Sequence, residues 1–338
     1  MRRSRPVAVA LALALGAGAL TACESGGGRR VTIYSGRTEE LIAPLLERFA
    51  QESGISVDVR YGDSADLALL LNEEGDKSPA DVFLSQSPGA MGYVDGSDLL
   101  RELPDEILDQ IDARFRAGDG DWVGVSGRVR VLVYNREKVD LGTLPDSVFD
   151  LTQGRYRGKV GIAPTNASFI DFVTAMREIE GDERTLAWLE GLKANDAQEY
   201  ANNIAIVEAV GRGEIDLGLV NHYYNEQAKA EDPGIASENF VFPNGDIGAV
   251  ILVTAAGVLR TSARTDEAEQ LVDFLLSKEA QEYFAEQTFE YPLAAGVEPT
   301  VEDLPPLADI AGPSVELSSL GNELAKTREL IQQAGFEA

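Results

Sequence analysis

The repeated alternation of short apolar segments with amphipathic segments constrains this fold more than any other feature of the sequence. Residues 31–36 (VTIYSG) alternate as a β-strand does, and residues 38–54 place apolar side chains at helical spacing. The pattern continues with a strand at 55–62, a helix at 64–75 and a strand at 80–86. Alternation of this kind builds a parallel sheet covered by helices, and its ligands bind beyond the carboxyl ends of the strands. The sequence therefore predicts an α/β fold.

A second series of the same kind begins in the middle of the chain. We predict strands at 128–135 and 159–164, and helices at 168–181, 264–287 and 319–338. The passages from strand to helix are small and polar in both series, as a binding cleft requires. The chain therefore contains two α/β lobes rather than one.

Two long apolar strands, near 129–134 and 249–254, are where we expect the chain to cross between the lobes. These crossings set the predicted boundaries between the two lobes. Lobe 1 comprises residues 31–128 plus about 250–304, and lobe 2 comprises residues 129–249 plus about 305–338. Two lobes joined by paired strands can close around a ligand by hinge motion.

The first 22 residues have the pattern of a secretory signal peptide. Three arginines precede an apolar run, Val7–Leu20, that is too short to span a bilayer. The run ends in Leu-Thr-Ala-Cys, which resembles a bacterial lipobox and predicts cleavage before Cys23 and a lipid on its sulfur; the alternative is an ordinary signal peptide. Residues 23–30 then form a flexible tether. We expect an extracytoplasmic protein anchored to the cell membrane by this lipid.

The composition argues against a nucleic-acid partner and against stabilisation of the fold by disulfide bonds. Cys23 is the only cysteine, so an intramolecular disulfide cannot form and the core must hold the fold. The formal charge of −28 argues against nucleic acid as a partner, because binding to phosphates depends on clustered Lys and Arg. We expect a well-solvated monomer.

The residues available for chemistry favour metal binding by oxygen ligands. His222 is the only histidine, so a zinc site or a catalytic triad finds few candidate residues. The segment DLGLVNHYYN, residues 216–225, contains the adjacent Tyr223 and Tyr224. Phenolate is a strong ligand for ferric iron, and two tyrosines in a loop could both reach one ion. The alternative is that the pair packs at the end of a strand.

Several blocks of the sequence resemble, in order, the periplasmic ferric-iron-binding proteins of iron ABC transporters. The blocks include YSGRTEEL, EEGDKSPADVFLSQ, GIAPTNASF, YANNIAIVEAVGRGEIDLGLVNHYY and EYPLAAGVEP, and the resemblance runs from about Val31 to about Leu304. It implies a type II periplasmic binding protein fold, with two α/β lobes, a two-strand hinge and a ligand cleft between the lobes. It also implies delivery of ferric iron, or of a ferric chelate, to an ABC permease and its ATPase, without enzymatic activity.

The resemblance also assigns residues to the site. It makes Tyr223 and Tyr224 the paired phenolate ligands of the iron. Carbonate, phosphate or citrate would serve as a synergistic anion, bound at a helix N-terminus where free N–H groups favour negative charge. The residues assigned to this anion are Asn166, Ala167 and Ser168 in the PTNAS loop, with Asn203 and Asn221 as amide donors.

Two positions depart from the family pattern. Thr38 stands where a His ligand is frequent, and Gln86 stands where a Glu ligand is usual. Either water, a chelator or a larger anion then occupies these ligand positions, or the ligand is not bare iron. Arg37, Arg128 and Arg130 could bind such an anion by bidentate pairing, and structural ion pairing is their alternative role. We expect His222 to be an exposed loop histidine; the alternative is that it donates a hydrogen bond to a residue that binds the ligand.

Two other functions stay open on the sequence alone. An anion or an organophosphorus compound could bind the same fold through the PTNAS loop without metal. A cell-surface enzyme that depends on carboxylates is the second alternative.

Overall fold

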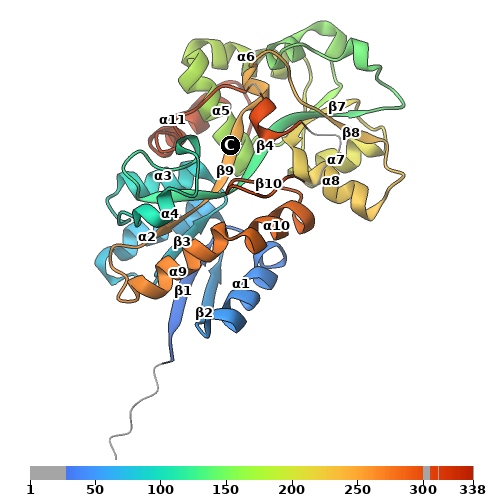
Figure 1. Cartoon of the computed structure of the whole chain (residues 1–338). Helices are drawn as coiled ribbons and strands as arrows, with labels where there is room; N and C mark the ends of the chain where they lie inside the picture. Colours follow the sequence, from blue (N-terminus) through green and yellow to red (C-terminus); the bar gives the residue numbers. More distant parts are fainter. Residues whose placement is uncertain (1–27, 300–304, 311, 338) are drawn as a thin grey trace, which may run out of the picture.

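The computed structural model describes residues 28–299, 305–310 and 312–337, and it confirms the predicted α/β fold. The strands follow one path in the order β2-β1-β3-β9-β4-β7-β5-β6, with β8 and β10 paired to β4 beside it. Figure 1 shows two groups of elements joined through β4 and β9. The strands are β1 (Arg30–Ser35), β2 (Ser56–Tyr61), β3 (Val82–Ser85), β4 (Trp122–Asn135), β5 (Val160–Ile162), β6 (Gln198–Glu199), β7 (Leu217–Asn221), β8 (Ser237–Phe240), β9 (Ile251–Val258) and β10 (Tyr291–Pro292).

Helices cover the strands of each group (Figure 1). The first group carries α1 (Glu39–Ser53), α2 (Ser64–Glu74), α3 (Pro88–Gly96), α4 (Asp105–Leu108), α9 (Thr265–Leu276) and α10 (Lys278–Gln287). The second group carries α5 (Ala167–Glu180), α6 (Asp182–Ala194), α7 (Asn203–Gly211) and α8 (His222–Glu231). Short 3₁₀ helices are η1 (Gly75–Lys77), η2 (Ala113–Phe115), η3 (Leu141–Thr143), η4 (Val148–Thr152), η5 (Gly154–Tyr156), η6 (Ile247–Ala249) and η7 (Leu307–Asp309).

The predicted parallel pairing holds within each group but not between the groups. β1 is parallel to both β2 and β3, and β5 is parallel to both β6 and β7. The two long strands β4 and β9 instead run antiparallel to each other and to their other neighbours. Parallel strands within a group bring their carboxyl ends to one edge, so the polar loops that follow them lie together.

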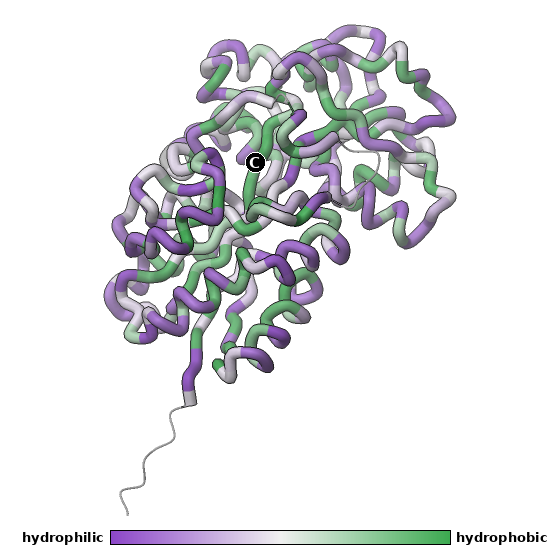
Figure 2. The backbone as a smooth tube through the Cα atoms, in the orientation of Figure 1, coloured by the Kyte–Doolittle hydropathy of each residue, from purple (hydrophilic) through white to green (hydrophobic). Residues whose placement is uncertain are grey.

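β4 belongs to both groups of strands. Its residues 122–129 pair with β9, and its residues 130–135 pair with β7 and β8. All 14 residues of β4 are buried, and the tube in Figure 2 is mostly hydrophobic along the central strands. β4 therefore links the two groups through one continuous, buried strand.

The C-terminal helix α11 (Leu320–Gln333) contacts helices of both groups. We expected it in lobe 2, and it does pack against α5 and α6. It also packs against α3, where a Cβ on Gly321 would lie 2.1 Å from the backbone nitrogen of Tyr93. Glycine is therefore needed at this position for the two helices to approach so closely.

The amphipathic segment 264–287 forms two helices instead of the single helix we predicted. α9 ends at Leu276, and Ser277 adopts an extended backbone with φ −60° and ψ 154°. The Ser277 side chain accepts a hydrogen bond from the Ala280 backbone N–H and so caps α10. Serine is among the residues most favoured at this capping position, and it breaks the otherwise continuous periodicity.

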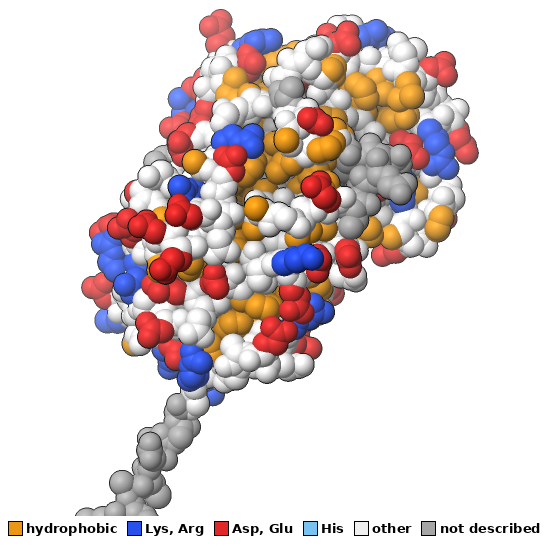
Figure 3. Space-filling view, in the orientation of Figure 1, with side chains coloured by type: hydrophobic (Ala, Val, Ile, Leu, Met, Phe, Trp, Pro, Cys, Tyr) orange, Lys and Arg blue, Asp and Glu red, His pale blue; other side chains and the backbone are white. Residues whose placement is uncertain are grey.

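The surface carries charges of both signs with acidic side chains in excess. On the face drawn in Figure 3, Asp and Glu are spread over both groups with Lys and Arg between them. Among the described residues, we find no helix with the length and apolarity needed to cross a membrane. The predicted signal peptide and Cys23 lie outside the described residues.

Candidate metal and anion site

A cavity of about 330 Å³ lies between the two groups of elements. It is bounded by the loops after β1 and β3, by β4, and by the first turns of α2, α5 and α8. Close packing fixes these loops: a Cβ on Gly36 would lie 1.9 Å from the Ser64 hydroxyl, which also accepts a hydrogen bond from the Gln86 backbone N–H. The predicted site residues that line the cavity are Thr38, Gln86, Asn166, Ala167, Ser168, Asn221, Tyr223 and Tyr224.

The two tyrosines lie in the first turn of α8, where we predicted a loop. β7 ends at Asn221 and α8 begins at His222, so the pair follows the carboxyl end of a buried strand. Successive side chains of a helix point about 100° apart, so helix geometry alone does not bring adjacent rings together. The ring centroids of Tyr223 and Tyr224 are 4.2 Å apart with 31° between their planes. Both side chains therefore reach the same cavity.

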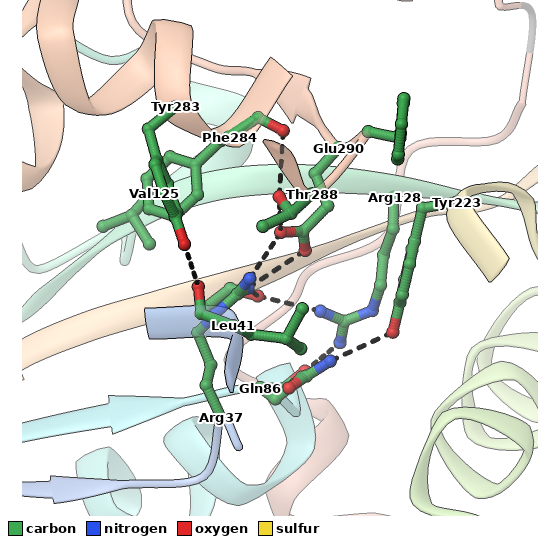
Figure 4. A network of polar contacts seen from close by, with 12 residues as sticks. Arg37, Leu41, Gln86, Val125, Arg128, Tyr223, Tyr283, Phe284, Thr288 and Glu290 are labelled. Carbon is green, nitrogen blue, oxygen red and sulfur yellow. Dashed lines mark hydrogen bonds and ion pairs between the residues drawn. The ribbon is translucent and has the colours of Figure 1, made fainter. Parts of the chain in front are cut away.

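Tyr223 is the more deeply placed of the two. Its side chain is 1% exposed, whereas Tyr224 is half-buried. Burial raises the pKa of Tyr223 well above 10.0, Tyr224 raises it further, and Arg128 lowers it in part. The Tyr223 hydroxyl accepts a hydrogen bond of 3.1 Å from Nε2 of Gln86 (Figure 4). A proton therefore stays on this phenol at neutral pH unless a metal displaces it.

The PTNAS loop forms the N-terminus of α5 as predicted. Asn166 is the N-cap, and its Oδ1 accepts hydrogen bonds from the backbone N–H and the hydroxyl of Ser168, at 3.1 and 2.7 Å. Nδ2 of Asn203 donates to Asn166 Oδ1 and to Ser168 Oγ, at 3.1 and 3.2 Å. Asn203 is buried behind the loop and does not line the cavity. It therefore positions the loop, and of the two amide donors that we predicted, Asn221 is the one that lines the cavity.

Two buried arginines of β4 add positive charge to the site, Arg128 in the wall of the cavity and Arg130 outside it, where it contacts two lining residues. Nη1 of Arg130 donates to Asn221 Oδ1 and to Ser168 Oγ, at 3.1 and 3.4 Å, and burial lowers the pKa of Arg130 to about 9. Arg128 lines the cavity, and it donates to the Gln86 carbonyl and, over 3.0 Å, to Thr254. Within the described part of the chain, neither arginine has a carboxylate in an ion pair and both Nε atoms lack a hydrogen-bond partner.

Arg37 does not face the cavity, contrary to the role in anion binding that we expected. Its two terminal nitrogens pair with the two carboxylate oxygens of Glu290 at 3.0 and 2.6 Å, and Nη1 also donates to Thr254 (Figure 4). Both side chains of the pair are at most 1% exposed. Burial alone would raise the pKa of Glu290, and Arg37 more than offsets this, so the pKa lies below its ordinary value. The alternative that we gave for the arginines, structural ion pairing, describes Arg37.

His222 is buried and holds α8 in place, so our expectation of an exposed loop histidine is wrong. Its Nδ1 accepts a hydrogen bond from the Val129 backbone N–H at 3.2 Å, and Nε2 lies 2.8 Å from the Phe289 carbonyl. The proton is therefore on Nε2. Burial lowers the pKa of His222 to about 4. The ring does not line the cavity, and it ties the start of α8 to β4 and to the segment before β10.

Asp171 is a cavity residue that we did not predict from the sequence. This carboxylate lines the cavity, and its Oδ1 accepts a hydrogen bond of 2.9 Å from the Ser87 hydroxyl. Burial raises the pKa of Asp171 to about 6, although Arg128 lowers it in part. The sequence could have indicated Asp171 as a cavity residue, because it follows Ser168 by one helical turn and so lies on the same face of the helix.

The fold and the site together define a solute-binding protein. Two α/β groups share β4, and a polar cavity between them is lined by residues from both. The sequence profile of the bacterial extracellular solute-binding protein family matches residues 77–310. The chain belongs to this family, whose members bind and transport solutes, and it is therefore not an enzyme.

Similar proteins and structures are named for ferric iron. The major ferric iron-binding protein of Neisseria meningitidis is 34% identical over 313 residues, which cover 91% of this chain and 93% of that protein. The iron-bound structure of HitA from Pseudomonas aeruginosa has a TM-score of 0.85 and 34% identity, covering 91% of this chain and all of that chain. A Trichodesmium protein (IdiA, FutA), solved with iron and citrate ligands, has a TM-score of 0.78, 27% identity, and coverage of 91% and 100%. These matches confirm the resemblance and the type II periplasmic binding protein fold.

Proposed function

We propose that this protein captures ferric iron outside the cytoplasm and delivers it to an ABC permease and its ATPase. The observation that carries the proposal is the placement of Tyr223 and Tyr224 in one cavity, with rings 4.2 Å apart, opposite Gln86. Two phenolates are hard, anionic oxygen ligands, and these suit a trivalent cation better than the neutral donors around them. The names of the related proteins support the same ligand.

The charges around the cavity support a synergistic anion. Fe³⁺ with two phenolates retains one positive charge, and the buried Arg128 and Arg130 add two more. An anion such as carbonate, phosphate or citrate, bound at residues 166–168, would neutralise much of this charge. The N-terminus of α5 favours negative charge through its free backbone N–H groups. Citrate is a ligand in the Trichodesmium structure, which supports this class of anion.

Capture and release follow from the two-lobed arrangement. We assign the lobes as residues 31–128 plus about 250–304 and residues 129–249 plus about 305–338, with the hinge at the two strand crossings near 129–134 and 249–254. Closure brings Thr38 and Gln86 of lobe 1 toward the tyrosines of lobe 2, and the permease separates the lobes to release iron. A lipid on Cys23 would keep the protein at the cell membrane as a monomer beside its permease.

A spectroscopic titration tests the iron site. Addition of Fe³⁺ in bicarbonate buffer is expected to produce a visible band from phenolate-to-iron charge transfer, with a stoichiometry of one iron per chain. The competing function, binding of an anion or an organophosphorus compound without metal, predicts no band and heat of binding on addition of phosphate alone. A protein that binds phosphate tightly and gives no band with Fe³⁺ would favour that second function.

A further inference from the structure

Asp171 lies on the face of α5 that borders the cavity. Ala167, Ser168 and Asp171 are spaced so that they share one face of the helix, and all three line the cavity. The face begins at the capped N-terminus of α5, so its side chains are fixed to the same element as the anion loop. Asp171 is therefore the acidic member of a row of residues that lines the cavity.

The Asp171 carboxylate is buried with one oxygen unused. The residue is 1% exposed, and its Oδ1 accepts the hydrogen bond from Ser87. Its Oδ2 has no hydrogen-bond partner among the described residues. Leaving a carboxylate oxygen buried without a partner costs free energy, and such a group in a cavity wall calls for a ligand.

The other carboxylates of described residues that line the cavity, Glu40 and Asp63, are placed differently. Both are exposed. Asp63 is the N-cap of α2 and accepts a hydrogen bond of 2.8 Å from the Ala65 backbone N–H, and Glu40 lies in the first turn of α1. Their charges stabilise helix N-termini while solvated. Asp171 alone among these three combines burial with an unpartnered oxygen.

We propose that the Asp171 carboxylate is a ligand of the metal, binding iron through Oδ2 in the cavity that the two tyrosines also line. The inference rests on the proposed iron site and adds a third anionic oxygen from the protein. With two phenolates and one carboxylate, the charge of Fe³⁺ is balanced by the protein alone, and the anion is left to balance Arg128 and Arg130. The hydrogen bond from Ser87 to Oδ1 orients the carboxylate, as outer hydrogen bonds commonly orient metal ligands.

A purely electrostatic role for Asp171 makes different predictions. Arg128 acts on Asp171, so the carboxylate could serve only to balance the arginine charge. Removing the carboxylate would then leave the iron coordination unchanged and strengthen anion binding, because the positive charge of the arginines would be less balanced. A metal ligand predicts the reverse, a changed iron spectrum with weaker iron binding.

The test compares Asp171→Asn with Asp63→Asn in the full-length protein. Both substitutions remove one negative charge from the same cavity, and Asn caps a helix as well as Asp does. We expect Asp171→Asn to lower Fe³⁺ affinity at least about tenfold in competition with citrate and to change the electron paramagnetic resonance spectrum of the bound iron. Asp63→Asn should retain the wild-type spectrum and stay within about threefold of its affinity.

Three results would overturn the inference. The first is an Asp171→Asn protein with wild-type affinity and spectrum, and the second is an equal loss in both variants. The third, which does not depend on the variant folding, is a crystal structure of the iron-loaded wild type with the Asp171 carboxylate outside the coordination sphere of the metal. A failure of the proposed function is separate, because the wild type would then give no charge-transfer band at all.

Discussion

Nε2 of Gln86 donates a hydrogen bond of 3.1 Å to the hydroxyl of Tyr223, and this contact joins the two lobes across the cavity. Gln86 follows β3 in the first group of strands, and Tyr223 lies in the first turn of α8 in the second. The amide is neutral, so it adds no charge to the site. A metal that binds the Tyr223 oxygen as phenolate must either displace this hydrogen bond or bind while Gln86 still donates it.

Replacing Gln86 by Glu should reduce the dependence of iron binding on an added anion. The carboxylate would stand beside Tyr223 and supply a negative charge where the chain now has an amide. We expect wild-type affinity for Fe³⁺ to fall at least about tenfold when bicarbonate and other anions are removed, and the Gln86→Glu protein to lose less. Parallel titrations in both buffers measure the difference. Equal wild-type affinity in the two buffers would contradict the synergistic anion.

The Arg37–Glu290 pair should contribute to stability rather than to iron coordination. Glu290→Gln leaves a buried guanidinium without its charge partner, so the free energy of unfolding should fall by about 3–5 kcal/mol. Breaking the exposed pair Arg157–Asp196 by Asp196→Asn should cost less than about 1 kcal/mol. Urea unfolding of the metal-free proteins measures both. An altered charge-transfer band in folded Glu290→Gln would show that the pair also acts on the metal.

His222 should make the free energy of unfolding depend on pH. Its pKa is about 4 when folded against an ordinary 6.5, so the unfolded state binds more protons between these values. The stability that the neutral ring provides is present above pH 6.5 and is lost as pH falls toward 4, by about 3 kcal/mol in total.

The matched variant for this effect is His222→Asn. The difference in unfolding free energy between wild type and variant should shrink as pH falls from 7 to 4, because only the wild type contains the group. Other titrating groups, such as Asp171, are common to both proteins and cancel in the difference. NMR titration of the single imidazole gives its pKa directly, and a value near 6.5 would contradict the buried, neutral ring.

Cys23 should determine whether the protein stays with membranes. The lipobox pattern predicts a mature N-terminus at a lipid-modified Cys23. Cys23→Ala is expected to leave the precursor uncleaved or to release the protein into the soluble fraction. Mass spectrometry of the wild type that shows an unmodified N-terminus at another residue would contradict the anchor.

Local patterns in the sequence located the parts of the site that depend on one strand and the helix after it. Tyr223 and Asn166 each follow the end of a buried strand, where the polar residues of parallel sheets gather, and both line the cavity. Local patterns could not predict the ion-pair partner of Arg37, because Glu290 lies 253 residues further along the chain. Only the folded chain shows that Arg37 is already neutralised.

Burial was the other property that local patterns did not give. His222 adjoins two residues that face the cavity, yet its ring points to β4 and to Phe289, which belong to other parts of the chain. Serine is a common helix cap, so Ser277 could have indicated the break between α9 and α10. The amphipathic period continues across this residue, and we therefore predicted a single helix. Tertiary contacts therefore decided the roles that the sequence left open.

The tyrosine pair gives the most direct test of iron binding. If Tyr223 and Tyr224 bind Fe³⁺ as phenolates, each Tyr→Phe change keeps the ring and removes the donor oxygen. Each single variant should shift the charge-transfer band and lower iron affinity by about 10–100-fold, and the double variant should lose the band. Circular dichroism should show an unchanged fold. A double variant with wild-type affinity and spectrum would return the pair to a packing role.

Proton release distinguishes ligation from mere proximity. Burial holds the pKa of Tyr223 well above 10.0 in the empty site, so the phenol is protonated at neutral pH and iron must displace its proton. Each proton released makes the apparent iron affinity rise about tenfold per pH unit, and the complex is lost as pH falls. Tyr223→Phe should therefore release one proton fewer per iron than wild type, as measured by back-titration in weak buffer. Equal proton release from the two proteins would mean that iron binds without the Tyr223 phenolate.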